Sequence, residues 1–177
     1  MSTESLNEAV PSVEVTHSPT TLSSAAAVIA ALFGGLAGGA VSVLALVFCL
    51  LGVVGIAGSL FGIESRRGVS VGVAVLFFGV MLGGVLGNSA PFLIVATIGT
   101  ILAFDLGHNA FSIGEQMSDE TPTSRGELVH AAASLLIGVV ASVVSYLIYM
   151  LGATGVTTGA LTFVLLAAIA LVWTFRS

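Results

Sequence analysis

Lysine is absent from this sequence, and its four basic residues, all arginines, stand against nine acidic ones. Charged residues make up only 7 % of the 177 residues, whereas a soluble domain usually carries about a quarter. So few charges cannot cover a folded surface that faces water. The composition therefore predicts an integral membrane protein, and the lack of a basic patch excludes a surface for nucleic acid.

Cysteine is almost absent as well, and the single example, Cys49, lies within an apolar run. One cysteine cannot form an intrachain disulfide or supply a cysteine-rich metal site. We therefore expect Cys49 to behave as a small buried hydrophobic residue. No cofactor is predicted.

The first 21 residues contain three glutamates, two prolines and no basic residue. A secretory signal needs a positively charged start followed by an early apolar core, and this segment has neither. Its composition is typical of a flexible, acidic tail. We predict a disordered tail over residues 1–21 and a transmembrane domain over residues 22–177.

Long apolar runs follow the tail. The run from Leu22 to Ile63 would extend about 60 Å as one helix, twice the roughly 30 Å hydrocarbon core, so it must fold back on itself. The glycine-rich stretch from Gly34 to Ala40 is its weakest helical part and marks the turn. Turn-forming segments separate the later runs, and Ser124 with Glu127 fits a capping box that starts a new helix.

The predicted fold is therefore all-α, a polytopic membrane protein with about six transmembrane helices behind a flexible acidic N-terminal tail. The six predicted spans cover residues 22–39, 42–63, 69–87, 92–117, 125–151 and 157–175.

All four arginines fall on one side of this arrangement. Arg66 and Arg67 follow the second span, Arg125 follows the fourth, and Arg176 follows the sixth. The positive-inside rule makes that side cytoplasmic. We therefore predict a multi-pass protein of the cell membrane with its arginine-bearing loops and C-terminus in the cytoplasm. The N-terminus is cytoplasmic if the first hairpin is real, and external if it is not.

Small residues recur at every fourth position in most of the spans. Helices in lipid associate by close packing of such residues, so we predict GxxxG-type packing; a pore-lining role is the alternative. The repeats are Gly34/Gly38, Gly35/Gly39, Gly58/Gly62, Gly79/Gly83/Gly87 and Gly99/Ala103/Gly107.

The fourth span changes character toward its end. Asp105 lies about 20 Å from the start of the span at Phe92, and beyond it polar side chains recur at helical spacing. The helix is therefore expected to emerge amphipathic on the cytoplasmic side. The polar residues that share one face are Asp105, His108, Asn109, Ser112, Glu115 and Gln116.

The fifth span carries a polar stripe of its own, made by Glu127, His130 and Ser134. An antiparallel hairpin centred on the loop places His130 opposite residues 112–115 and Ser134 near Asn109. On this register the two stripes interlock at the cytoplasmic end, and His130 lies about 7–12 Å along the axis from the Asp105/His108 pair.

Four interpretations of this polar cluster compete. The Asp-x-x-His and Glu-x-x-His patterns resemble those of di-iron helix bundles, but the further carboxylates are missing within the membrane. Ser112 with His130 could form a hydrolytic pair, although no oxyanion element accompanies them. Intramembrane Asp and His residues can also mark a proton relay or polar conduit. The fourth interpretation is structural: Asp105 and His108 satisfy each other and nearby backbone or water, and so fix the two spans in register.

The segment FDLGHNAFSIGEQMSDETPTSRGELVHAAASL, from Phe104 to Leu135, resembles a family of small haloarchaeal membrane proteins of unknown function. The residues that carry the resemblance are Phe104, Asp105, Gly107, Asn109, Ala110, Gly114, Glu115, Gln116, Arg125, Glu127, Leu128, His130, Ala131, Ala132 and Ser134.

That resemblance has three implications. The family often has Glu where this chain has His108, which argues against a role that needs an imidazole there. A halophilic, archaeal source suits the lack of lysine and the acidic tail. Relatives are encoded near MoxR-type ATPases and transglutaminase-like membrane proteins, which implies a partner role in a membrane complex.

The function predicted from the sequence is that of a non-enzymatic structural or accessory subunit of a membrane or envelope assembly. It has no catalytic residues and no metal, and its partners are the lipid bilayer and further membrane or cytoplasmic proteins. The alternative is a small-solute or proton pathway along the polar faces of the fourth and fifth spans.

Overall fold

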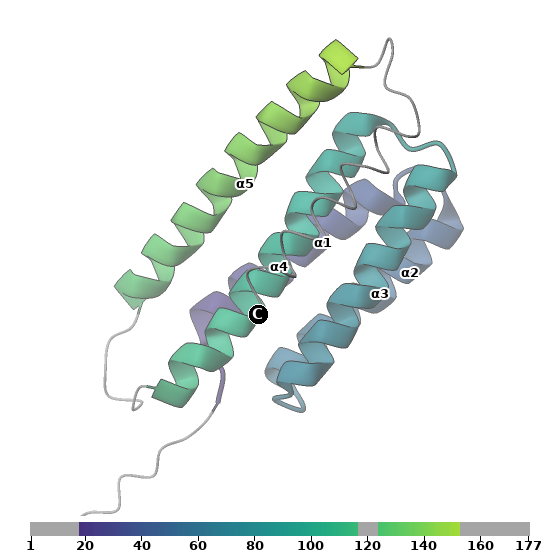
Figure 1. Cartoon of the computed structure of the whole chain (residues 1–177). Helices are drawn as coiled ribbons and strands as arrows, with labels where there is room; N and C mark the ends of the chain where they lie inside the picture. Colours follow the sequence, from purple (N-terminus) through teal and green to yellow (C-terminus); the bar gives the residue numbers. More distant parts are fainter. Residues whose placement is uncertain (1–17, 117–123, 153–177) are drawn as a thin grey trace, which may run out of the picture. The chain divides into compact units, whose positions relative to one another are not determined.

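The computed structural model describes residues 18–116 and 124–152, and these residues form five α-helices and no strand (Figure 1). The predicted all-α class is confirmed for this part of the chain. The sixth predicted span and most of the predicted acidic tail lie outside the described residues. The helices are α1 (Thr21–Gly39), α2 (Val43–Phe61), α3 (Arg66–Val85), α4 (Ala90–Gln116) and α5 (Ser124–Gly152).

The helix ends fall within three residues of five of the predicted spans, and local side chains explain several of them. Ser42 precedes α2 and its hydroxyl accepts from the backbone N–H of Leu44 at 3.2 Å. Ser65 does the same for α3 through the N–H of Gly68, also at 3.2 Å. Both are N-caps, which satisfy donors that the first turn of a helix leaves free.

All five helices are long and apolar enough to cross a membrane, judged by length and composition. The helices α4 and α5 have 27 and 29 residues. At 1.5 Å per residue each helix is about 40 Å long, which is more than the roughly 30 Å thickness of the hydrocarbon core of a bilayer.

The chain divides into two compact units, and the boundary follows Ser142. The first contains α1 to α4 and the first part of α5. The second is described over residues 143–152 only, and there the rings of Tyr146 and Tyr149 stack with their centroids 6.3 Å apart.

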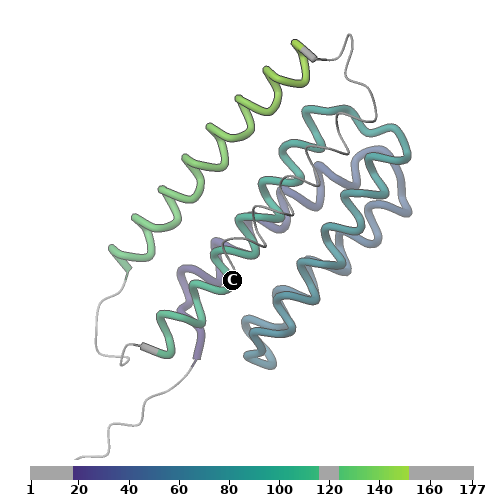
Figure 2. The backbone as a smooth tube through the Cα atoms, in the orientation of Figure 1, coloured from purple at the N-terminus to yellow at the C-terminus, as the bar shows by residue number. Residues whose placement is uncertain are grey.

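Within the first unit, α1 packs against α2 and α4, and α3 also packs against both of these helices (Figure 2). The side chains between them are mostly small: Ala27, Ala31 and Ala103 are fully buried. Cys49 is fully buried among them, which confirms its prediction as a small buried residue.

Several glycines lie where two helix backbones approach closely. A Cβ built on Gly99 would stand 2.6 Å from the Cα of Gly34 and 2.7 Å from the carbonyl oxygen of Ala30. Such distances leave no room for a methyl group. Gly58 differs, since a Cβ there would meet nothing within 4 Å. Close approach therefore holds at some of the predicted small-residue positions and fails at others.

This contrast leads to a stability test with a matched control. Gly99→Ala should lower the free energy of unfolding by about 1–3 kcal/mol, because the backbone of α1 must shift to admit the methyl group. Gly58→Ala should instead be neutral or stabilising by up to about 1 kcal/mol, because alanine has the higher helix propensity and the site is open. Thermal unfolding of both variants in the same detergent measures the difference, and equal melting temperatures would contradict it.

Candidate functional site

The polar stripe of α4 is divided between two neighbouring helices. Asp105 bonds to α5, whereas His108, Ser112 and Glu115 face α3. The prediction that the whole stripe interlocks with the fifth span was therefore wrong for these three residues. Residues at these spacings cover about 120° of a helix surface, which is wide enough to meet two neighbours.

The Asp105 carboxylate joins α4 to α5. Its Oδ2 accepts from the hydroxyl of Ser134 at 2.6 Å and lies 3.1 Å from Nε2 of His130. The side chains of Asp105 and His130 are 40 % and 42 % exposed, so both are only partly buried. They form an ion pair whenever the imidazole is protonated.

The predicted register of this hairpin was wrong. His130 meets Asp105 directly instead of residues 112–115, a shift of about eight residues or 12 Å. Gly138 agrees with the observed register, since a Cβ there would lie 3.1 Å from the Cγ2 of Ile98. The axial register of α4 and α5 is therefore the one in which Asp105 bonds to His130 and Ser134, and not the one that a turn centred on the loop would give.

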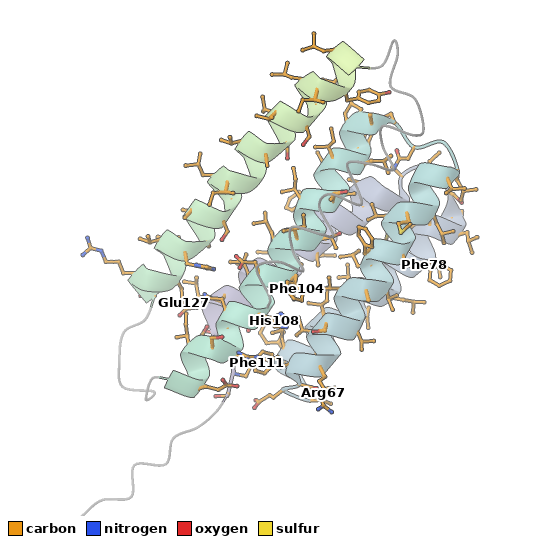
Figure 3. All side chains as sticks on the ribbon, in the orientation of Figure 1. Arg67, Phe78, Phe104, His108, Phe111 and Glu127 are labelled. Carbon is orange, nitrogen blue, oxygen red and sulfur yellow. The ribbon has the colours of Figure 1, made fainter. Side chains whose placement is uncertain are left out.

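Glu127 lies near the start of α5 and joins this helix to α1, a partner that no sequence pattern predicted (Figure 3). The side chain is buried, with 2 % exposed. Its Oε2 accepts three hydrogen bonds: from the hydroxyl of Thr20 at 2.7 Å, from the backbone N–H of Ser23 at 2.9 Å, and from the hydroxyl of Ser23 at 2.6 Å. A single carboxylate oxygen therefore holds the start of α1.

Glu127, although it belongs to another helix, accepts a hydrogen bond at the start of α1 as an N-cap side chain would. Thr20 occupies the N-cap position of α1, but its side chain makes no capping bond, and the first turn of α1 has no acidic residue. The N–H of Ser23 is one of the donors that a helix start leaves free, and a carboxylate also complements the positive end of the helix dipole. The sequence pattern placed Glu127 in a capping box of its own helix, whereas its Oε2 caps α1.

The other half of the stripe joins α4 to α3. Arg66 Nη2 donates to the Ser112 hydroxyl at 2.7 Å and lies 3.8 Å from the Glu115 carboxylate. The ring of His108 has its Nδ1 2.9 Å from the carbonyl oxygen of Phe104 and its Nε2 3.3 Å from the hydroxyl of Ser70. The hypothesis that His108 and Asp105 satisfy each other was therefore wrong, because they bond to different helices.

Two buried polar atoms find no hydrogen-bond partner among the described residues. They are Nδ2 of Asn109, which belongs to the predicted stripe, and the hydroxyl of Ser24 on α1, which was not predicted. Ser24 is 1 % exposed. Nothing on the sequence level distinguishes Ser24 from its neighbour Ser23.

The geometry also bears on the two chemical interpretations. Glu127 and His130 share a face of α5 but bond to different helices, and no three acidic, His or Cys residues gather as a metal site within residues 18–116 and 124–152. Ser112 bonds to Arg66 on the α3 side, away from the His130 that a hydrolytic pair would need. What the described arrangement does is join helices.

These features define the class of the protein: an all-α chain whose long apolar helices are compatible with a multi-pass membrane protein. The chain belongs to a family of unknown function, DUF7519, which it matches over residues 17–172. Comparison with curated proteins and with solved structures finds no match.

The Asp105 junction can be tested by two substitutions of similar size. Asp105→Asn keeps an oxygen that accepts from Ser134 and His130, so it should cost less than about 1 kcal/mol of unfolding free energy. Asp105→Leu leaves both partners unpaired and should cost about 1–3 kcal/mol. Thermal unfolding of the purified variants measures both effects. A loss as large for Asn as for Leu would show that the charge, and not the hydrogen bonds, matters at this position.

Proposed function

We propose that the protein is a non-enzymatic structural or accessory subunit of a membrane or envelope assembly. The observation that carries this proposal is the contrast between α5 and the other helices. In the apolar stretches of α1 to α4, 33 to 44 % of the residues are buried, whereas none of the corresponding stretch of α5 is. A helix that the other described helices cover so little offers its surface to lipid or to another membrane helix.

The exposed side chains of α5 are large and apolar. Within the first unit, Leu128, Val129, Leu136 and Ile137 are each 62 to 69 % exposed. Side chains of this kind suit the packing of a second transmembrane helix as well as they suit lipid. Three polar side chains near the start of α5 already bond within the protein: Glu127 to α1, and His130 and Ser134 to Asp105. The exposed apolar surface is therefore the larger part of α5 that a partner could contact.

The family resemblance of residues 104–135 suggests which proteins such partners are. A MoxR-type ATPase would act from the cytoplasm, and a transglutaminase-like membrane protein would lie beside the helices in the bilayer. The sequence places four acidic residues, Glu115, Asp119, Glu120 and Glu127, around the loop between the fourth and fifth predicted spans, and such a group would suit a basic cytoplasmic partner. Glu127 is buried against α1 and Glu115 lies 3.8 Å from Arg66, so Glu127 does not contribute to such a surface. Asp119 and Glu120 lie outside the described residues.

Photo-crosslinking in native membranes tests the role of α5. A photoreactive amino acid at Ile137 should give a discrete protein adduct, since this position belongs to the proposed partner surface. The same amino acid at Val54 of α2, with 67 % exposed against 69 % for Ile137, is the matched control and should react with lipid. Identical products at the two positions would contradict the proposal.

The alternative function is a small-solute or proton pathway, and the Asp105–His130 contact is the observation that favours it. A relay needs a group that titrates, so Asp105→Asn would abolish flux into sealed vesicles as completely as Asp105→Leu. A structural junction predicts no flux that depends on Asp105.

The orientation proposed from the arginines can be combined with the observed contacts. The N–H of Thr20 donates to the carbonyl of Ala110 at 3.1 Å, and Arg66 reaches Ser112, so the starts of α1 and α3 share one end of the bundle. We propose that this end is cytoplasmic, which also places the N-terminal segment inside.

Cysteine labelling tests this orientation. In a Cys49→Ala background, a cysteine at Ile63 or Ser124 should be protected in intact cells from an impermeant thiol reagent, and one at Ser89 should react. Ile63 is 72 % exposed and makes a better site than Ser65, which caps α3. Labelling at position 63 or 124 before the cells are opened would reverse the orientation.

A further inference from the structure

We propose that α5 is a latched helix: polar bonds near its start hold it on the bundle, and its release uncaps α1. This device is a property of the fold itself and does not depend on the identity of any partner.

The first step is that the hydrogen bonds which the described residues of α5 make to other helices are gathered near its start. Glu127 bonds to Ser23 of α1 and to Thr20 at its N-cap, and His130 and Ser134, one and two turns later, bond to Asp105 of α4. Two carboxylate oxygens, Oε2 of Glu127 and Oδ2 of Asp105, therefore receive all of these bonds.

The second step is that α5 lacks the interlocking that holds the other helices. A Cβ on Gly99 of α4 would stand 2.6 Å from the Cα of Gly34 in α1, and one on Gly52 of α2 would stand 2.5 Å from the backbone N of Leu76 in α3. Within residues 124–142 of α5, a Cβ on Gly138 would meet only the side chain of Ile98, at 3.1 Å, and no helix backbone. Polar bonds can exchange partners with water at a membrane surface, whereas a backbone-to-backbone contact cannot separate without opening a gap.

The third step is that the latch is shared with α1. Glu127 supplies the carboxylate that accepts from the N–H and hydroxyl of Ser23, and Thr20 supplies no cap of its own. If α5 leaves the bundle, this acceptor leaves with it. The first turn of α1 then loses an acceptor that a helix start needs, so the order of that turn reports whether α5 is docked.

The two carboxylates differ in a way that makes the coupling testable. Glu127 touches α1, but the described bonds of Asp105 run to α5 and none of them to α1. A purely local cap would respond to substitutions at Glu127 alone. A latch responds to both, because loss of either attachment frees the same helix.

The docked state can be measured by disulfide formation. In a Cys49→Ala background, cysteines at Ile98 and Gly138 should crosslink readily, because a Cβ on residue 138 lies 3.1 Å from Cγ2 of Ile98, which is bonded to the Ile98 Cβ. Cysteines at Gly38 and Ala96 provide a control pair between α1 and α4, far along α1 from the latch, where a Cβ on residue 38 lies 3.4 Å from the Cβ of Ala96. Glu127→Ala and Asp105→Leu should slow the first pair severalfold and leave the control pair unchanged.

The coupling to α1 is measured by hydrogen exchange of the peptide that contains Ser23. Exchange should become roughly tenfold faster in Glu127→Ala, the size expected when one hydrogen bond to a charged group is lost. It should also become faster in Asp105→Leu, although that residue is not bonded to α1. Ser134→Ala removes a single bond and serves as a milder variant that should shift both readouts in the same direction.

Glu115→Gln is the matched control, because it removes a carboxylate charge from the same end of the bundle without touching α5. It should change neither crosslinking nor exchange. The latch is refuted if crosslinking between positions 98 and 138 is unaffected by both carboxylate variants. It is equally refuted if exchange at Ser23 responds to Glu127→Ala but not to Asp105→Leu.

Discussion

The start of α1 depends on a carboxylate that the chain supplies more than a hundred residues later. A helix start leaves four N–H groups without partners, and at the edge of a membrane such groups must be satisfied by the protein or by interfacial water. Glu127 meets this need for Ser23 and also accepts from the hydroxyl of Thr20. The burial of an acidic side chain and the satisfaction of a free donor in the first turn of α1 therefore follow from one contact.

Glycine packing and polar bonding divide the task of holding the helices together. Because lipid is as apolar as leucine, burial of apolar surface gives little driving force between helices, and close approach of backbones replaces it. Close backbone contact of this kind joins α1 and α4, for example at Gly34 and Gly99. The start of α5 is held instead by Glu127 and Asp105, so its attachment is local and chemically specific.

The helices could be predicted from the sequence because their signals are local: apolar runs of bilayer length, separated by glycine, serine and proline. The junctions could not. A stripe that covers about a third of a helix fits one neighbour or two, and periodicity alone does not decide which, so His108 and Glu115 were assigned to the wrong helix. The register failed because a symmetric turn was assumed. The partners of Glu127 were not predicted because no local pattern around Thr20 or Ser23 indicates an acidic residue more than a hundred positions away.

The placement of position 108 gives the family resemblance a physical reading. The resemblance of residues 104–135 implies that Glu often stands at position 108 in related chains, and the contacts of His108 show what such an exchange would do. His108 faces α3, with its Nε2 3.3 Å from the Ser70 hydroxyl, and Arg66 lies 3.4 Å from its carbonyl oxygen. A glutamate there could accept from Ser70 and pair with Arg66, so either residue would join α4 to α3. Ser112 and Glu115 join the same two helices through Arg66, so position 108 extends a junction that the following turn of α4 also makes.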